Sequence, residues 1–236
     1  MPRYSTEAVV LSASDFMESD RIVHVLTSRH GLVGAIAKGA LRSRRRFPGA
    51  LEPFSEVRLD MFQGRASQLH RIEQAVLVDA HMELRQDLVL MGHAAVLLDM
   101  AKEHLGPLDP APLVYACLKD ALSGLSGTRQ WFASWCSYLM DMLGLLGYGI
   151  DLSGAGNSGG RGAPEGTLSG QARAFLDSAP RLGRDALARV VLGEEVKREI
   201  RIFLLERCGR VSLRPLRTVM FLAKLLDLDI EQCYMI

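Results

Sequence analysis

Within residues 55–62, SEVRLDMF, polar and apolar side chains alternate from Glu56 to Met61. Val57, Leu59 and Met61 fall on one side of the pattern, and charged side chains fall on the other. A period of two is typical of a β-strand with one buried face, because successive side chains of a strand point to opposite faces. This stretch therefore predicts a half-buried strand in a small β-rich domain.

Four further segments between residues 6 and 79 have a similar β-rich composition, with turn dipeptides at His30-Gly31 and Gln63-Gly64. Together the predicted strands span residues 7–12, 21–27, 32–38, 54–62 and 68–78. Five short strands fit a small barrel, and the OB-fold is the five-stranded barrel that binds oligonucleotides. An SH3-like barrel is the alternative.

The pattern changes to helical spacing near residue 81. Apolar residues recur at that spacing in segments 83–104, 111–122, 128–146, 185–208 and 215–226. A glycine-rich stretch at 153–170, SGAGNSGGRGAPEGTLSG, interrupts them and predicts an exposed loop. We therefore expect an α+β chain of two domains, with an OB-fold nucleic-acid-binding domain at 1–80 and an all-helical domain at 81–236.

Composition excludes several classes of protein. The 28 Lys and Arg residues nearly balance the 27 Asp and Glu, so affinity for a polyanion must come from local clusters of charge. The four cysteines include no C-x-x-C pair, which argues against a zinc site and a disulfide framework. The apolar runs are shorter than the roughly 18 residues of a membrane span, and the first residues do not resemble a signal peptide. We expect a cytoplasmic protein without a membrane partner.

The strongest local cluster of charge is KGALRSRRRF at 38–47, which contains no acidic side chain. Phosphates require several cations on one surface, and guanidinium groups bind them bidentately. The aromatic ring after the arginines offers a stacking face for bases, although packing inside the barrel is the commoner role for a single ring. A solvated basic turn is the alternative for the loop as a whole. The predicted DNA-binding residues are Lys38, Arg42, Arg44, Arg45, Arg46 and Phe47.

A second basic set lies in the last two predicted helices, interleaved with glutamates. Intrahelical ion pairs, such as Arg198 with Glu194, would absorb several of these charges. The set is therefore a secondary candidate for binding DNA or an acidic protein tail. Its members are Lys197, Arg198, Arg201, Arg210, Arg214 and Arg217.

Catalytic signals are weak. Gly154, Gly156 and Gly159 spell G-x-G-x-x-G, but this motif follows a predicted helix and lacks the βαβ setting that a dinucleotide site requires. The six histidines show no metal-ligand spacing, and no nucleophile motif accompanies them. We predict no catalytic residue, no cofactor and no metal, and therefore no enzyme.

Several longer segments occur in a distinctive order. They are ESDR at 18–21, AKGA at 37–40, FPGALEPF at 47–54, LGYGIDL at 146–152 and ERCGRVSLRPLRTVMFL at 206–222. In this order the segments resemble the RecO family of bacterial recombination mediators.

The resemblance implies an N-terminal OB-fold, a helical C-terminal domain and a role at the bacterial nucleoid. It implies binding of single- and double-stranded DNA, annealing of complementary strands and, with RecR, loading of recombinase onto DNA coated by single-strand-binding protein. In the family, the C-terminal tail of that coating protein docks on the helical domain. A protein-interaction adaptor, with no direct role in DNA binding, is the alternative.

The chain departs from the family at one place. Many members carry two pairs of cysteines after the G-Y-x-x-D-L segment and bind zinc there, whereas this chain has the glycine-rich stretch at 153–170. We therefore expect no structural zinc and a mobile loop.

Overall fold

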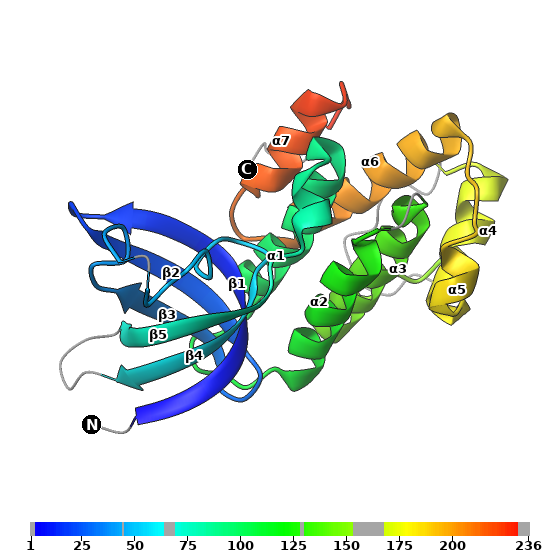
Figure 1. The fold of residues 1–236 in the computed structure, drawn as a ribbon. Helices are drawn as coiled ribbons and strands as arrows, with labels where there is room; N and C mark the ends of the chain where they lie inside the picture. Colours follow the sequence, from blue (N-terminus) through cyan, green and yellow to red (C-terminus); the bar gives the residue numbers. More distant parts are fainter. Residues whose placement is uncertain (1–2, 44, 64–68, 128–129, 153–167, 231–236) are drawn as a thin grey trace. The chain divides into compact units, whose positions relative to one another are not determined.

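The structure is a computed structural model that describes residues 3–43, 45–63, 69–127, 130–152 and 168–230 (Figure 1). The chain forms two compact units. The barrel unit comprises residues 1–82 and 101–122, and the helical unit comprises residues 83–100 and 123–236.

Five strands close into the barrel in the order β1-β2-β3-β5-β4. Strands β3 and β5 pair in parallel, and the other neighbours pair antiparallel. The strands are β1 (Arg3–Phe16), β2 (Asp20–Thr27), β3 (Gly31–Ala37), β4 (Glu56–Gln63) and β5 (His70–Asp79). This arrangement confirms the predicted OB-type barrel.

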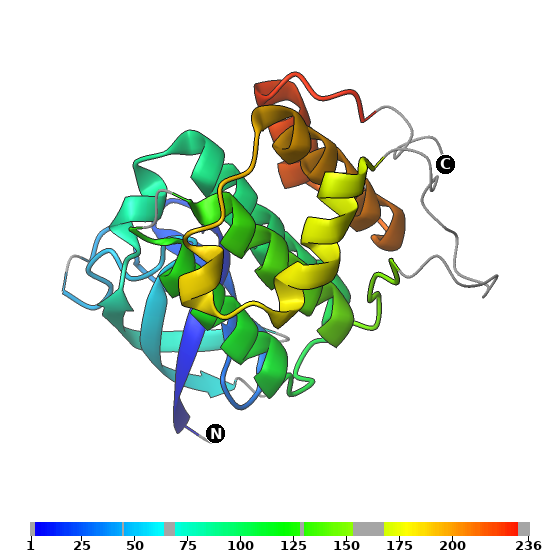
Figure 2. The same cartoon turned by 90° about the vertical axis from the view of Figure 1, so that its right-hand side faces the viewer.

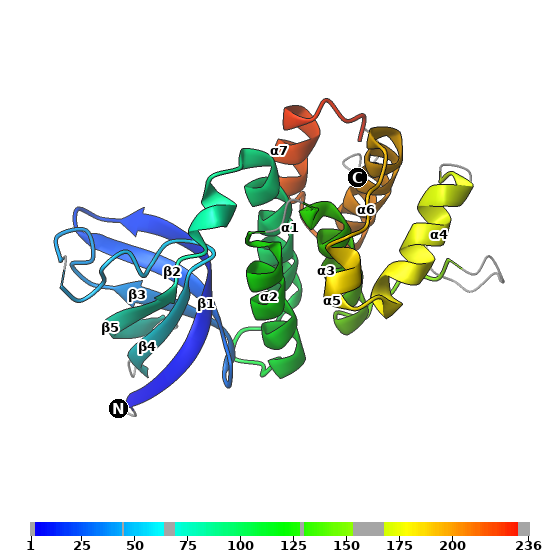
Figure 3. The same cartoon turned by 45° about the vertical axis from the view of Figure 1, so that its right-hand side comes forward.

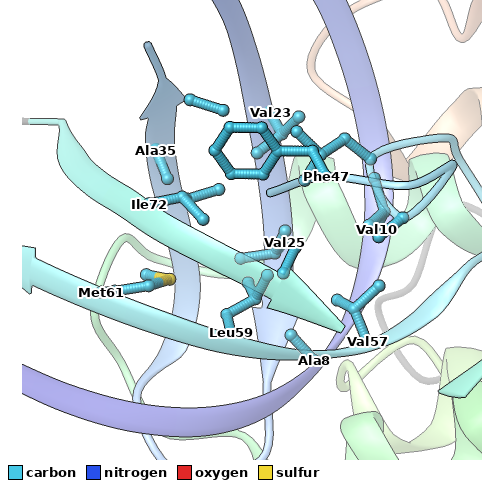
Figure 4. Packing of buried hydrophobic residues seen from close by; sticks show 14 of the residues in the cluster. Ala8, Val10, Val23, Val25, Ala35, Phe47, Val57, Leu59, Met61 and Ile72 are labelled. Atoms are coloured by element: carbon cyan, nitrogen blue, oxygen red, sulfur yellow. The ribbon is translucent and has the colours of Figure 1, made fainter. Parts of the chain in front are cut away.

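The barrel interior is filled by the apolar half of each alternating strand. Val57, Leu59 and Met61 of β4 are buried there, as the alternation predicts. Side chains from β1, β2, β3 and β5 meet them in one continuous core (Figure 4). Removing this much apolar surface from water is the main source of stability for such a domain.

Strand β1 is longer than predicted. The sequence predicts a strand at 7–12, whereas β1 runs from Arg3 to Phe16 and pairs with both β2 and β4. The register with β2 shifts between Val10 and Ser12, after which the strand continues to the pair Phe16–Asp20. Its polar second half lacks the apolar alternation that marks a strand, and pairing with β2 maintains it instead.

The segment 101–122 joins the barrel unit through backbone and ionic contacts. The Leu108 N–H donates to the Leu32 carbonyl at 2.9 Å. The buried Glu56 carboxylate lies 3.0 Å from His81 Nε2 and 3.3 Å from Lys119 Nζ. These partners compensate the cost of burying a carboxylate.

Gly31 is required where the β2–β3 turn meets residue 109. Its φ is +65°, and an added Cβ would lie 1.8 Å from the Asp109 carbonyl oxygen. Gly31→Ala should therefore lower the free energy of unfolding by at least about 1 kcal/mol, because both the strain and the clash oppose it. Urea denaturation should show the loss. Gly49→Ala is the control, since Gly49 has φ +66° but no neighbour within 4 Å, and an equal loss in both variants would contradict the role of the contact.

The other regular elements of the described chain are helices. They are η1 (Met82–Arg85), α1 (Leu88–His104), α2 (Pro112–Leu125), α3 (Trp131–Leu145), α4 (Gly170–Ser178), η2 (Ala179–Arg181), α5 (Arg184–Leu187), α6 (Glu194–Val211) and α7 (Arg217–Leu225). Within the helical unit, α3 contacts α5 and α6, while α6 also contacts α4 and α7 (Figures 2 and 3). The predicted helical region is confirmed.

Two helix predictions are corrected. The single helix predicted at 185–208 is two helices, α5 and α6, because the chain is extended at Gly193 before α6 begins. Helix α4 begins at Gly170, inside the predicted loop 153–170, and the Ser169 side chain caps it by accepting from Ala172 N–H at 3.3 Å. Residues 153–167 lie outside the described part of the chain, so the mobility predicted for them stays a prediction.

Trp135 and His93 form the centre of the helical unit. The Trp135 side chain is fully buried, and its indole N–H donates to the His93 carbonyl at 2.9 Å. His93 is also fully buried, with Nδ1 2.7 Å from the Val89 carbonyl and Nε2 3.0 Å from the Arg201 Nε. Since Arg201 donates, Nε2 accepts and Nδ1 carries the proton. A neutral ring thus satisfies both contacts.

This histidine should make the helical unit sensitive to acid. Burial, with a contribution from the Arg201 charge, lowers the pKa of His93 to about 3. Between pH 6.5 and about 3 the unfolded ring takes up a proton that the folded ring does not, so stability falls as the pH falls, by about 1.4 kcal/mol per pH unit. Urea denaturation across this range should show a shallower acid slope for His93→Gln than for the unsubstituted chain. Equal slopes would contradict this assignment.

Candidate nucleic-acid interface

The basic loop lies in the connection between β3 and β4, and backbone contacts fix its path. The Gly39 N–H donates to Asp20 Oδ1 at 2.8 Å, and the Leu41 N–H donates to the Ser19 carbonyl at 3.0 Å. Farther along, the Arg46 carbonyl accepts from Ala75 N–H at 3.1 Å. The loop is therefore attached to the β1–β2 turn at one end and to β5 at the other.

Its described cationic side chains, Lys38, Arg42, Arg45 and Arg46, are all exposed. Arg42 lies 3.5 Å from the exposed Glu18 carboxylate, a pair of the kind that contributes little in water. Arg46 donates to the Lys38 carbonyl at 2.8 Å, so it also stabilises the loop. Arg45 makes no ion pair with any residue that the structure describes. Arg44 lies outside the described residues.

Phe47 belongs to the barrel interior. Its ring is 6% exposed and packs among the core residues (Figure 4), and the Arg46 guanidinium lies 5.0 Å from the ring centre. A ring enclosed in this way has no open face for a base, so the predicted stacking role of Phe47 is corrected. The alternative expectation, that the ring packs into the barrel, agrees with the structure.

Arg71 of β5 is a further cation of this site, and no local pattern in the sequence marks it. The Gly39 N–H, together with the Ser19 hydroxyl and the charges of Lys38 and Arg71, lowers the pKa of Asp20. Arg71 therefore lies close to the start of the loop. It is an isolated basic residue of β5, and only the parallel pairing of β5 with β3 brings it there.

The nearby carboxylates are engaged locally. The Arg21 guanidinium forms ion pairs with Asp15 and Glu52, and Asp20 accepts from the loop backbone. These contacts leave Lys38, Arg45 and Arg71 as cations without an ion pair to a described carboxylate. Such a group can bind phosphates without first breaking an internal ion pair.

The structure divides the second basic set into two groups. Lys197 pairs with Glu194, Arg210 pairs with Glu206, and the Arg201 Nε donates to His93. Arg198, Arg214 and Arg217 are exposed, and the structure describes no ion pair for them. The second group is therefore available to an outside ligand.

The described residues offer no metal site and no membrane-spanning helix. The described residues contain no group of three or more His, Cys, Asp or Glu side chains that could hold a metal ion. No helix within the described ranges is long and apolar enough to cross a membrane. The glycines of the G-x-G-x-x-G match lie outside the described residues.

Comparison with known proteins agrees with this architecture. A family model described as "Recombination protein O N terminal" matches residues 1–81, and one described as "Recombination protein O C terminal" matches residues 85–220. The chain belongs to the RecO family. The two matches together cover the barrel strands and nearly all of the helices.

Curated RecO proteins show the same relationship. The "DNA repair protein RecO" of Myxococcus xanthus is 35% identical over 147 residues, which cover 62% of this chain and 60% of the relative. That of Geobacter metallireducens is 33% identical over 154 residues, covering 65% and 62%. That of Cutibacterium acnes is 38% identical over 160 residues, covering 64% of each. The chain thus matches about three fifths of the length of these RecO relatives.

Proposed function

We propose that this chain is a DNA-repair protein of the RecO type that binds DNA through the loop at residues 38–46 and anneals complementary strands. The observation that carries the proposal is a basic loop whose backbone is fixed to the barrel while several of its cations stay exposed. We assign DNA binding to the predicted domain at 1–80. Its relatives are named DNA repair proteins, which supports this role.

Annealing requires no bond-making step by the protein. Two strands repel each other through their phosphates, and cations on the loop reduce this repulsion when each strand binds. Lys38, Arg45 and Arg71 supply charge for this purpose, with Arg42 available after exchange of its weak contact to Glu18. We therefore propose a non-enzymatic mediator that acts in the bacterial cytoplasm, at the nucleoid.

The partners that we propose are RecR and the C-terminal tail of single-strand-binding protein, with which the chain would help to load recombinase. The tail carries acidic and apolar side chains. Helix α7 and the segment before it present basic and apolar side chains that match them. Arg214 and Arg217 are exposed there, as are Met220 and Phe221. An acidic peptide with apolar side chains would pair with these two arginines and pack against Met220 and Phe221.

Annealing of complementary oligonucleotides, with and without single-strand-binding protein, tests the proposal. We expect the intact chain to accelerate annealing and the Arg44→Ala, Arg45→Ala, Arg46→Ala triple variant to be much slower. Equal rates for the two proteins would contradict a role for the loop. The adaptor alternative predicts no salt-dependent binding of isolated oligonucleotides, so a direct binding assay separates the two functions.

A further inference from the structure

The turn between β1 and β2 presents large apolar side chains to solvent. Met17, the first residue of the turn, is 78% exposed, and Phe16, which pairs with Asp20 at the end of the β1–β2 ladder, is 39% exposed. Leu41 of the basic loop is 45% exposed, and its N–H donates to the Ser19 carbonyl of the turn at 3.0 Å. This bond joins the two segments, and we call Phe16, Met17 and Leu41 the apolar tip.

The backbone of Met17 is strained. Its φ is +52°, in the left-handed region that long side chains rarely adopt. Phe54 and His81 also have a positive φ, but both are buried, so core contacts hold them in place. The exposed Met17 side chain gains little from the core. Because strained residues concentrate where a ligand is bound, the conformation of Met17 indicates a functional role for the tip.

The charges beside the tip indicate its ligand. Lys38, Arg42 and Arg45 of the adjoining loop are exposed, which favours a polyanion. Apolar side chains next to such cations insert between the base steps of duplex DNA and unstack them. The exposed Glu18 carboxylate of the turn lies 3.5 Å from Arg42. A carboxylate accepts from the amino groups that an opened base pair exposes, whereas an anionic lipid surface repels it.

We propose that the apolar tip inserts at the end of a DNA duplex and opens its terminal base pair, while the basic loop binds the neighbouring phosphates. This inference rests on the proposed function and adds duplex ends to the DNA on which the chain acts. A terminal pair is stacked on one side only, so an inserted side chain displaces it more easily than an interior pair. Opening short base-paired segments from their ends removes an obstacle to annealing.

The fluorescent base 2-aminopurine tests the opening, because its emission rises when it unstacks. At saturating concentrations, the intact chain should raise the emission of a probe in the terminal pair of a duplex but not that of a probe at its centre. Met17→Asn removes the apolar side chain and suits a positive φ, so it should abolish the rise and leave the barrel at least as stable in urea. Met17→Leu should keep the rise.

Met82→Asn is the matched control for this substitution. Met82 is 60% exposed and belongs to the barrel unit, but it lies outside the tip. We expect this variant to keep the rise in emission at the duplex end. No rise with the intact chain, or a rise that survives Met17→Asn, would contradict the inference. A loss of stability in Met17→Asn would show that the side chain serves the fold, which also contradicts it.

Oligothymidylate, which forms no duplex, separates this inference from the proposed function. Met17→Asn should leave its affinity within about twofold, whereas Arg45→Ala should weaken it. If Arg45→Ala binds as tightly as the intact chain, the phosphate-binding role of the loop fails, and this inference fails with it. If only the response at the duplex end is absent, the inference fails alone. Phosphatidylglycerol vesicles should not bind the chain, and binding that Met17→Asn abolishes would assign the tip to lipid instead.

Discussion

Trp135→Ala is expected to lower the free energy of unfolding of the helical unit by about 3–5 kcal/mol. The indole is fully buried, so its loss leaves a large cavity that the surrounding helices cannot fill. The substitution also removes the hydrogen bond to the His93 carbonyl. Urea denaturation followed by far-ultraviolet circular dichroism measures the effect.

Trp131→Ala is the matched control for this prediction. Trp131 begins the same helix and its ring centre lies 4.8 Å from that of His93, but its side chain is only half-buried. We expect a clearly smaller loss than for Trp135→Ala, because less apolar surface is removed from the core. Equal losses in the two variants would show that Trp135 is not the centre of this core.

The Arg44→Ala, Arg45→Ala, Arg46→Ala triple variant is expected to bind single-stranded DNA about 100-fold more weakly at roughly 0.1 M salt. The affinity for a single strand falls with about the 0.7 power of the salt concentration for each phosphate contact, so each lost contact lowers the affinity about fivefold at this salt concentration. Three lost contacts therefore lower the affinity about 100-fold. Fluorescence anisotropy of a labelled oligonucleotide measures this loss.

A control variant removes the same charge from elsewhere on the barrel unit. Arg3, Arg29 and Arg58 are exposed and lie outside the loop, so replacing all three with alanine changes the net charge equally. We expect the control to lose much less affinity than the loop variant. If the two triple variants bind equally weakly, overall charge rather than the loop determines DNA binding.

Local patterns in the sequence predict much of the barrel but not its full strand lengths. The alternation of Val57, Leu59 and Met61 marks β4 because one face of that strand is buried. The polar end of β1, by contrast, becomes a strand through pairing with β2, and no local period reveals that. Helix α4 escapes prediction because the glycine-rich composition extends to its first residue, Gly170.

In the candidate site, too, some residues can be predicted from the local sequence, whereas others depend on strand pairing. The loop cations are visible as a run of arginines, whereas Arg71 comes close to the loop only when β5 pairs with β3. Whether Phe47 points inward or outward depends on how the loop packs over the barrel end. Charge density therefore predicts the loop cations of the site, and the fold is needed to find Arg71.

The salt dependence of single-strand affinity tests the central claim, that the loop at residues 38–46 binds phosphates, most directly. The slope of log affinity against log salt concentration should be shallower by about 2 for the loop triple variant than for the intact chain, because about 0.7 is lost with each contact. The control triple variant should keep most of the original slope. An unchanged slope for the loop variant would contradict the claim.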